Sequence, residues 1–460
     1  MDVPLLTQYR SFLPRFYRLA SVGVLSNMMV PLAGLFDAAF LGHLADINQL
    51  AGVILGGILF DYLYRILKFL RNSTNALTAS AVGQDDPVAV LVAVLRCSLI
   101  AIVIAGVMLA LQHPIHELGF AILSGTADIE GAGLDYFNAR IWGAPAVLLN
   151  FVLIGWFLGR EMNGIVFLMS LVGNGTNVVF DYLMILRWGW DSMGAGLATA
   201  LSQYLALLVG LIAMALTTQW HLLKPAWSQA IARQGLTSAV VLKGNILVRF
   251  LTLISAYAIF TNLSASFGTE MLAENGLLLQ IALLSQFTVQ GVGMTSQTLI
   301  GNFKGKGRTD EILPVLQVAL VSALAIALTF SLGAILFPDA VFKLLTNHAE
   351  VSQAMRQSVG WLLPLLALTA TAFMLESYFL GMKDGATLRN GSILGFGVGF
   401  APLVVLAMYQ RSEYLLWSAL TAYMGVLSVF LIYRLIRTRT LLLQQDDEEK
   451  SSLRETQIVS

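Results

Sequence analysis

Apolar residues fill most of the chain in runs of about 20 or more, and short polar breaks separate these runs. A helix needs about 20 apolar residues to cross the roughly 30 Å hydrocarbon core of a bilayer. The sequence predicts twelve such helices, six in each half of the chain. They span residues 17–41, 50–82, 88–111, 134–158, 163–187, 193–219, 243–266, 271–303, 312–336, 354–380, 388–409 and 413–437. We therefore predict an all-α polytopic membrane protein.

Landmark residues of the first half recur in the second half at a nearly constant spacing. The pairs are Gly83 and Gly305, Gly159 and Gly381, and the Trp-x-x-Pro motifs that begin at Trp142 and Trp361. The glycine pairs are 222 positions apart and the tryptophans 219. A shared spacing indicates a duplicated unit, and two similar bundles that face each other are typical of secondary transporters. We expect two pseudo-symmetric six-helix bundles.

The repeat divides the chain into four parts. We expect an N-lobe over 1–219, a cytoplasmic linker over 220–242, a C-lobe over 243–438 and a disordered cytoplasmic tail over 439–460. The tail is polar from Gln444 onward, which favours disorder.

Composition agrees with a membrane protein, because 57% of residues are apolar and 12% are charged. The single cysteine, Cys97, excludes an intramolecular disulfide and a metal cluster of cysteines. The zero net charge carries no information about partners. Apart from membrane lipid and small-molecule substrates we expect no partner, no nucleic acid and a monomer.

Lysine and arginine gather in the loops on one side of the predicted bundle. The 42–49 loop and the 112–133 connection, on the other side, contain neither residue. The positive-inside rule therefore places both termini in the cytoplasm. The first apolar run is too long for a signal peptide and carries an aspartate near its end, so we expect it to be retained. We predict a bacterial inner-membrane protein.

Two carboxylates lie where lipid-spanning helices rarely carry charge. A charged group at the bilayer centre costs at least about 2.5–3.5 kcal/mol, so such residues are functional candidates. Asp37 precedes the outer end of the first helix by about five residues, and Asp181 precedes Arg187 on the fifth by about six. Because both helices cross in the same direction, the two acids fall at similar depth.

Polar residues accompany Asp181. Asn174, Asn177 and Asp181 follow i, i+3, i+7 spacing and share one helix face, and Thr199 lies at the same depth on the next helix. This all-oxygen set suits a proton shared between acids or a hard cation. Alternatively, these groups satisfy one another and fix helix packing, although two acids without an obvious basic partner are poorly suited to that purpose.

Pro31 lies six residues before Asp37 and favours a kink in the first helix. A bend there would move Asp37 relative to Asp181, or it would only shape the packing; the sequence does not separate these alternatives.

Further polar residues are candidates for a substrate cavity. They are Asp61, Arg65, Arg140, Gln280 and Phe287. Asp61, Arg65 and Lys68 share one face of the second helix, where an internal Asp61–Arg65 pair is favoured over a cavity wall. In the C-lobe, Arg249 and Glu376 both fall in the cytoplasmic third of their helices and could pair; such a pair would be a structural contact or a cytoplasmic latch.

Three short motifs carry a family resemblance. They are Gly155–Gly159 (GWFLG), Gly173–Asp181 (GNGTNVVFD) and Gly194–Ala200 (GAGLATA), with Gln203 after the last. Together they resemble the multidrug and toxic compound extrusion (MATE) family, and its DinF-type branch in particular. Phe69-Leu70-Arg71 and Leu388-Arg389-Asn390 fit the same branch.

The resemblance implies alternating access and export of lipophilic, often cationic compounds against a proton or sodium gradient. Carried over to this chain, the coupling site falls on Asp37, Asn177, Asp181 and Thr199, with the Ala195 carbonyl as a further ligand should the ion be sodium. Some relatives hold a cation in the C-lobe. Here the seventh helix offers no carboxylate within its span, which favours coupling in the N-lobe. We favour protons over sodium and expect no other cofactor.

Other functions are less well supported by the sequence. An exporter of a lipid-linked or polysaccharide precursor needs a cationic cavity; Arg65, Lys68 and Arg140 favour one, and the two acids argue against it. We expect no enzyme. The histidines form no metal-ligand pair, because His113, His116, His221 and His348 lie in predicted loops and His43 flanks the first helix, and no intramembrane hydrolase motif is present. A channel is disfavoured by the repeat.

Overall fold

The computed structural model describes the backbone of residues 4–41, 47–123, 127–345 and 349–459. Side chains are described for these residues except 4–8, 10, 30, 32–41, 47, 122, 123, 127, 233–243, 269, 344, 349 and 438–459.

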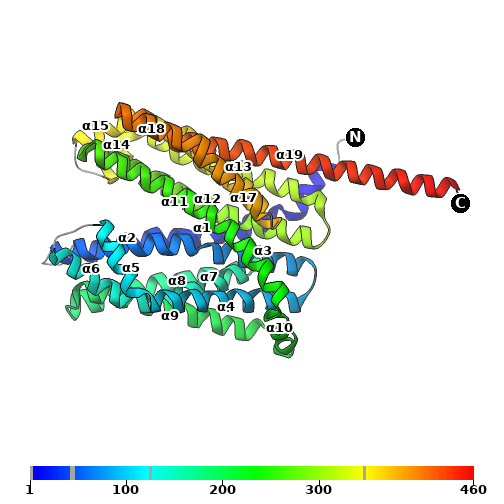
Figure 1. Ribbon diagram of the computed structural model, residues 1–460, viewed down its shortest axis with the longest axis horizontal. Coiled ribbons are helices and arrows are strands. Elements are labelled where there is room, and N and C mark those ends of the chain that lie inside the picture. Colours follow the sequence, from blue (N-terminus) through cyan, green and yellow to red (C-terminus); the bar gives the residue numbers. More distant parts are fainter. Residues whose placement is uncertain (1–3, 42–46, 124–126, 346–348, 460) are drawn as a thin grey trace.

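The described chain is helical throughout (Figure 1). The first half contains α1 (Pro4–Leu41), α2 (Ile47–Leu67), α3 (Phe69–Gly83), α4 (Pro87–Ala110), α5 (Gln112–Leu123), α6 (Ala127–Arg140), η1 (Ile141–Gly143), α7 (Ala144–Gly159), α8 (Asn163–Asp181), η2 (Tyr182–Arg187) and α9 (Asp191–Thr217). Between the halves lie η3 (Trp220–Leu222) and α10 (Leu223–Ala230). The second half contains α11 (Arg233–Phe267), α12 (Thr269–Gly305), η4 (Thr309–Glu311), α13 (Ile312–Leu336), α14 (Pro338–Leu345), α15 (Ala349–Ser358), η5 (Val359–Trp361), α16 (Leu362–Gly381), α17 (Gly385–Leu394), η6 (Gly395–Phe400), α18 (Ala401–Gln410) and α19 (Glu413–Val459).

The predicted membrane helices are confirmed. Eleven segments of the described residues are long and apolar enough to cross a membrane, and each matches a predicted helix within a few residues. The remaining prediction, 17–41, falls on α1, which starts earlier, at Pro4. Several spans combine two elements: the second joins α2 and α3 through a turn at Lys68. The division at 220–242 and the disorder of the tail from 439 stay predictions.

Backbone conformations repeat with the spacing of the sequence landmarks. Left-handed residues follow the helices at Asp85 and Gly307, and again at Glu161 and Lys383; the members of each pair are 222 positions apart. Their φ angles are 52° and 72° in the first pair and 60° in both members of the second. The two halves therefore turn their chains in the same way at corresponding places.

Packing repeats as well. A Cβ atom on Gly159 would lie 2.6 Å from the Cβ of Thr78, and one on Gly381 would lie 3.0 Å from the Cβ of Ile300. Thr78 and Ile300 are again 222 positions apart. In each half, a glycine lets the fourth membrane span touch the second. The prediction of two pseudo-symmetric bundles is confirmed.

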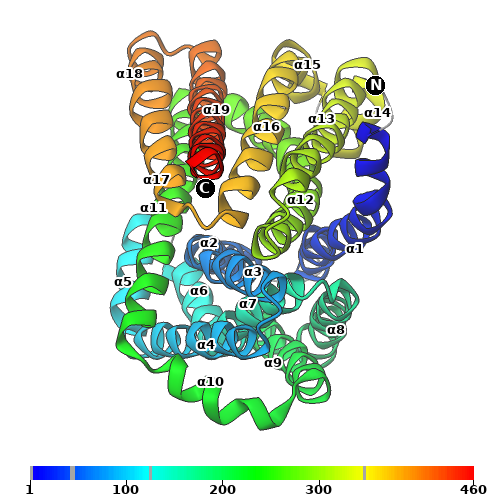
Figure 2. The ribbon, with the colours of Figure 1, turned by 90° about the vertical axis from the view of Figure 1, so that its right-hand side faces the viewer.

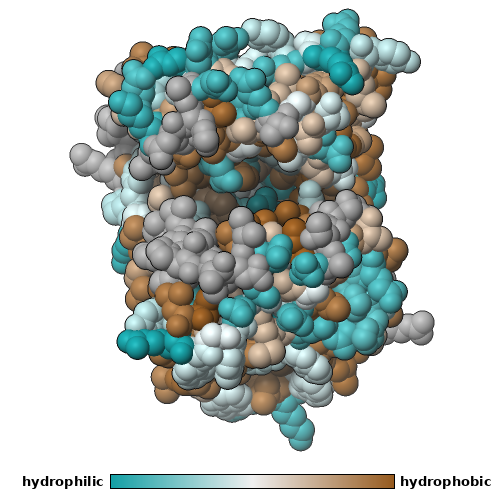
Figure 3. All heavy atoms as spheres, turned by 90° about the vertical axis from the view of Figure 1, so that its left-hand side faces the viewer, coloured by the Kyte–Doolittle hydropathy of each residue, from teal (hydrophilic) through white to brown (hydrophobic). Residues whose placement is uncertain are grey.

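The bundles form two lobes that touch near the chain ends and diverge at the other end. Figure 2 looks from the side where both termini lie and shows α2–α9 below α12–α19, with α11 running down from the upper lobe toward α10. The lobes touch where α12 packs on α1 and α3. There the Gln297 amide donates to the Asn72 carbonyl at 2.7 Å, and the Thr298 hydroxyl donates to Asn75 Oδ1 at 2.9 Å. From the opposite end, the surface is hollowed between the lobes (Figure 3).

Candidate functional site

Asp181 ends α8 inside the N-lobe, with 2% of its surface exposed. The amide Nδ2 of Asn177, one turn earlier, donates a hydrogen bond to Asp181 Oδ2 at 2.9 Å. Directly after Asp181 the helix widens into the π-helical turn η2. Wide turns of this kind are frequent at functional sites. The predicted contact between Asn177 and Asp181 is therefore present.

Thr199 and Ala195 lie on α9, which packs on α8. The Thr199 hydroxyl donates to the Ala195 carbonyl at 3.0 Å, so these two predicted ligands already contact each other. Small residues bring this helix close to α6: a Cβ on Gly196 would lie 2.6 Å from the Tyr136 carbonyl oxygen. The glycine-rich start of α9 thus serves packing.

Asn174 does not join this group. Its amide donates to the Ser170 carbonyl of its own helix at 2.7 Å. Asp37 lies on α1, but its side chain is outside the described residues, so the expected approach of Asp37 to Asp181 stays a prediction. The backbone of α1 is helical through Pro31.

A cavity of about 290 Å³ lies between the lobes, bounded by α2 on one side and by α11, α12 and α16 on the other. Its charged lining residues are Asp61, Arg65, Lys68 and Arg249. Phe287 lines it too, and the Lys68 ammonium lies 5.5 Å from the centre of that ring. Three of the residues predicted for the cavity, Asp61, Arg65 and Phe287, are thus brought together.

Asp61 and Arg65 form an ion pair at 3.7 Å while they line this cavity. Both alternatives from the sequence therefore hold. The pair is weak, because its side chains are 64% and 42% exposed and an exposed pair is worth at most about 1 kcal/mol.

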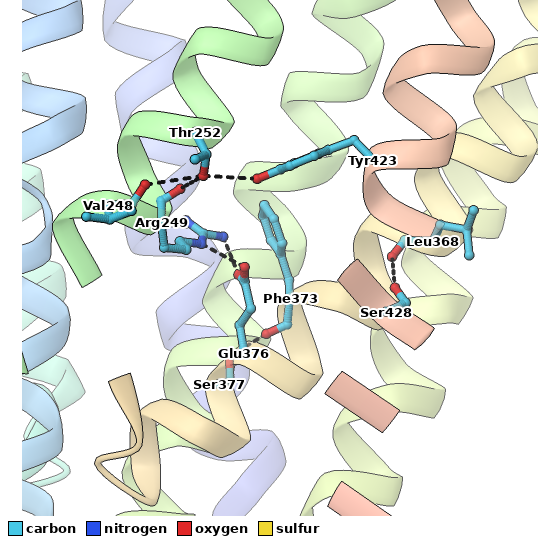
Figure 4. A network of polar contacts seen from close by, with 9 residues as sticks. All are labelled: Val248, Arg249, Thr252, Leu368, Phe373, Glu376, Ser377, Tyr423 and Ser428. Atoms are coloured by element: carbon cyan, nitrogen blue, oxygen red, sulfur yellow. Dashed lines mark hydrogen bonds and ion pairs between the residues drawn. The ribbon is translucent and has the colours of Figure 1, made fainter. Parts of the chain in front are cut away.

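The C-lobe wall of the cavity contains a buried ion pair between α11 and α16 (Figure 4). The Arg249 guanidinium donates two hydrogen bonds to the Glu376 carboxylate, and both side chains are less than 10% exposed. The guanidinium also lies 5.3 Å from the centre of the Phe373 ring. This pairing confirms the prediction made from helix depth.

Two predicted cavity residues lie elsewhere. Arg140 donates to the Tyr136 hydroxyl and lies 4.7 Å from the centre of the Phe60 ring, inside the N-lobe. Gln280 is exposed on α12 and is not among the lining residues. Its neighbours Gln286 and Gln290 line the cavity instead, since they lie on another face of the helix.

Two further basic residues belong to the site. Lys68 lines the cavity, as its place on the face of Asp61 and Arg65 allows. Arg71, one turn later, is not predicted from the sequence as a site residue; its guanidinium donates to Gln290 Oε1 at 3.3 Å. The signal for both is a basic residue every third position in an apolar helix.

A polar contact closes the lobes at the end that carries the termini. Glu161, in the turn between α7 and α8, accepts two hydrogen bonds from the Arg15 guanidinium. It also accepts from the Asn302 amide of α12 at 2.9 Å. One carboxylate thus ties α1 and the N-lobe to the C-lobe.

The family model named MatE matches the sequence twice, over residues 24–183 and 246–405. The chain belongs to the MatE family. The two matches start 222 positions apart, the spacing of the landmarks. Members of this family are transporters, so the prediction that the chain is not an enzyme is confirmed.

Curated MatE relatives cover nearly the whole chain. DNA damage-inducible protein F of Escherichia coli K12 is 28% identical over 425 residues, which are 91% of each chain. A probable multidrug resistance protein NorM of Thermotoga maritima is 22% identical and covers 84% of this chain and 81% of its own. The expected resemblance to the DinF branch is thereby confirmed.

Solved MatE structures share the fold. A MOP-superfamily transporter from Pyrococcus furiosus, whose binding pocket is described as having reverse polarity, superposes with a TM-score of 0.83 at 18% identity. An outward-facing MATE transporter does so with 0.83 at 17%. Each match covers 93% of this chain and 96% of the other. In the described part of this MatE chain, no three His, Cys, Asp or Glu side chains gather to hold a metal ion.

Proposed function

We propose that this MatE transporter exports small lipophilic molecules in exchange for protons, through a coupling pair of Asp37 and Asp181. The contact that carries this proposal is the hydrogen bond from Asn177 to the buried carboxylate of Asp181. A carboxylate in a lipid-spanning helix is rare, and in transporters such residues take part in proton relays.

The N-lobe provides the means to sense a proton. Asp181 is the last residue of α8 before the π-helical turn, and α8 packs on both α1 and α9. When Asp181 gains a proton, the acceptor of the Asn177 amide becomes a neutral acid. The hydrogen bond weakens, since bonds to charged groups are about twice as strong as neutral ones. Such a change would alter how α8 packs on α1, the helix that carries Asp37.

Alternating access needs a closed end and an open end that exchange. The lobes are held together beside the termini by Glu161 and open toward the central cavity at the other end. We assign the closed end to the cytoplasm from the positive-inside rule. Export would then end with release from the cavity to the outside, after which protons enter from that side.

Sodium remains the alternative coupling ion. The Asp181 carboxylate, the Asn177 carbonyl and the Ala195 carbonyl are oxygen ligands of the kind a hard cation prefers. The coupling ion is tested by reconstituting the full chain in liposomes and imposing a pH gradient or a sodium gradient. Accumulation of a fluorescent lipophilic probe under the pH gradient alone supports protons, and accumulation under sodium alone contradicts them.

The sequence predicts a preference for cationic substrates, but the cavity has three basic lining residues and one acidic one. This excess of basic residues does not favour cations. The same observation favours the second candidate function, export of a lipid-linked or polysaccharide precursor. The apolar lining and the multidrug resistance name of the Thermotoga maritima relative favour small molecules.

A further inference from the structure

Three basic residues, Arg65, Lys68 and Arg71, lie at a spacing of three along one face of the second membrane span. Arg65 and Lys68 line the cavity, and Arg71 lies behind its lining residue Gln290. Their spacing of three residues places them on neighbouring turns of α2 and α3. Like charges at this spacing repel one another, so the arrangement destabilises an empty protein.

Two of these cations lack an ion pair within the described residues. Asp61 pairs with Arg65, and Glu376 pairs with Arg249. Within the described residues, Lys68 and Arg71 make no ion pair. The interaction of Lys68 with Asp61 is a long-range electrostatic attraction and not a contact. The acidic side chains around the cavity therefore do not neutralise the positive charge of its basic side chains.

Arg71 also has an unused hydrogen-bond donor. The side chain is 8% exposed, and its Nε has no acceptor, although its Nη2 bonds Gln290. A buried donor without an acceptor is unfavourable, and more so in a charged group. An incoming acceptor near Gln290 would recover part of this free energy.

Opposite these cations, the cavity wall is aromatic and aliphatic. Phe287, Phe250, Phe373, Tyr257 and Leu283 line it on the C-lobe side. Such a wall favours a ligand with apolar surface, because it shields that surface from water. The site therefore combines a cationic side and an apolar side.

We propose that the central cavity binds an amphipathic organic anion: an apolar body with one carboxylate, sulfonate or phosphate group. The anionic group lies beside Lys68, with Arg65 and Gln290 in reach, and the apolar body packs on Phe287. This inference names the substrate class of the transporter and so rests on the proposed export function. A free organic anion and an anionic lipid headgroup share this chemistry.

A cationic substrate fits this site less well. It would have to approach Lys68 and Arg65 with Asp61 as the one acidic lining residue. Contacts between like charges in a desolvated site are strongly unfavourable. Asp61 is also the most exposed member of the set and is already paired with Arg65.

The test uses two probes with the same body and opposite charge, pyrenesulfonate and pyrenylmethyl-trimethylammonium. Binding to the full chain in nanodiscs is measured by fluorescence anisotropy, which does not require transport. We expect the sulfonate to bind at least about tenfold more tightly than the ammonium. We expect Lys68→Gln to weaken sulfonate binding about tenfold or more and Lys68→Arg to retain it.

Matched variants distinguish an effect of the cavity residues from an effect of the protein's total charge. Lys306→Gln removes the same charge from an exposed loop and should leave both affinities unchanged. Asp61→Asn releases Arg65 from its partner and should strengthen sulfonate binding while weakening ammonium binding. Should Lys68→Gln fail to fold, Asp61→Asn still tests the proposal.

The possible outcomes decide between the proposals. Tighter binding of the ammonium, or equal sulfonate binding by wild type and Lys68→Gln, would overturn the anion site. Sulfonate binding without movement of either probe under any gradient would leave the anion site and contradict the export function. Fluorescent phosphatidylglycerol that displaces the sulfonate and crosses the bilayer in a Lys68-dependent way would identify the anion as a lipid headgroup.

Discussion

Gly83 and Gly305 lie against each other across the interface between the two lobes. A Cβ atom on either glycine would lie 2.8 Å from the Cα of the other. Because they occupy equivalent positions 222 residues apart, the pseudo-twofold axis of the protein passes close to this contact. Corresponding ends of α3 and α12 thus touch only because neither carries a side chain here.

We predict that Gly83→Leu separates the lobes at this end. The nearest atoms are backbone atoms of Asn302 and Gly305, which cannot yield as a flexible side chain would. The measurement uses Ser80→Cys, a buried reporter on α3, in a Cys97→Ala background. Labelling by a membrane-impermeant maleimide should rise severalfold. Gly106→Leu on α4, where a Cβ meets no neighbour, is the control and should leave labelling unchanged.

Glu161→Gln should loosen the same interface. The substitution removes the charge that holds Arg15 and retains a group that accepts from Asn302. Because a hydrogen bond to a charged group contributes about 1.5–3 kcal/mol, we expect maleimide labelling of the Ser80→Cys reporter to rise by about tenfold. Glutamine keeps the backbone preference at this left-handed position, where φ is 60°. Labelling equal to that of the parent would show that this contact does not hold the lobes together.

Asn177 and Asn174 provide a matched pair on one helix. Asn177→Ala removes the donor to Asp181, whereas Asn174→Ala removes only a bond to the helix's own backbone. We therefore expect initial transport rates to fall about tenfold for Asn177→Ala and by less than about twofold for Asn174→Ala. Equal rates for the two variants would argue against a role of the Asn177–Asp181 contact in coupling.

The buried pair of Arg249 and Glu376 should be strongly non-additive. Either Arg249→Met or Glu376→Gln leaves a buried polar partner without its ion pair, at a cost of about 3–5 kcal/mol when the remaining group stays charged. The double variant should lose less than the sum of the two, because no unpaired charge remains. Thermal unfolding of the purified proteins measures this. Additive losses would mean that the two side chains do not depend on each other.

Local sequence signals predicted the membrane spans well and side-chain placement less well. Hydropathy is a property of neighbouring residues, so helix ends agree with the structure within a few residues. Depth along a helix follows from residue number, and it placed Arg249 opposite Glu376 correctly. Rotation about the helix depends on packing, which explains why Arg140 and Gln280 do not line the cavity.

The basic excess of the cavity is visible only in part in the sequence, where Arg65, Lys68 and Arg140 favour a cationic cavity. In sequence, Arg65 and Lys68 are two of many cations, and Arg249 lies 184 and 181 residues after them. The fold brings them to one space and pairs Arg249 with Glu376, which leaves Lys68 and Arg71 without ion pairs among the described residues. Counting charges along the chain does not reveal this arrangement.

Proton-driven export through the N-lobe carboxylates is tested most directly with Asp37→Asn in liposomes. Wild type and variant are reconstituted in equal amounts, with pyrenesulfonate and its ammonium counterpart as probes and with unfolding temperatures measured in parallel. We predict that an imposed pH gradient drives probe accumulation by wild type, and that Asp37→Asn abolishes accumulation while its unfolding temperature is unchanged. Normal pH-driven transport by folded Asp37→Asn would contradict the account.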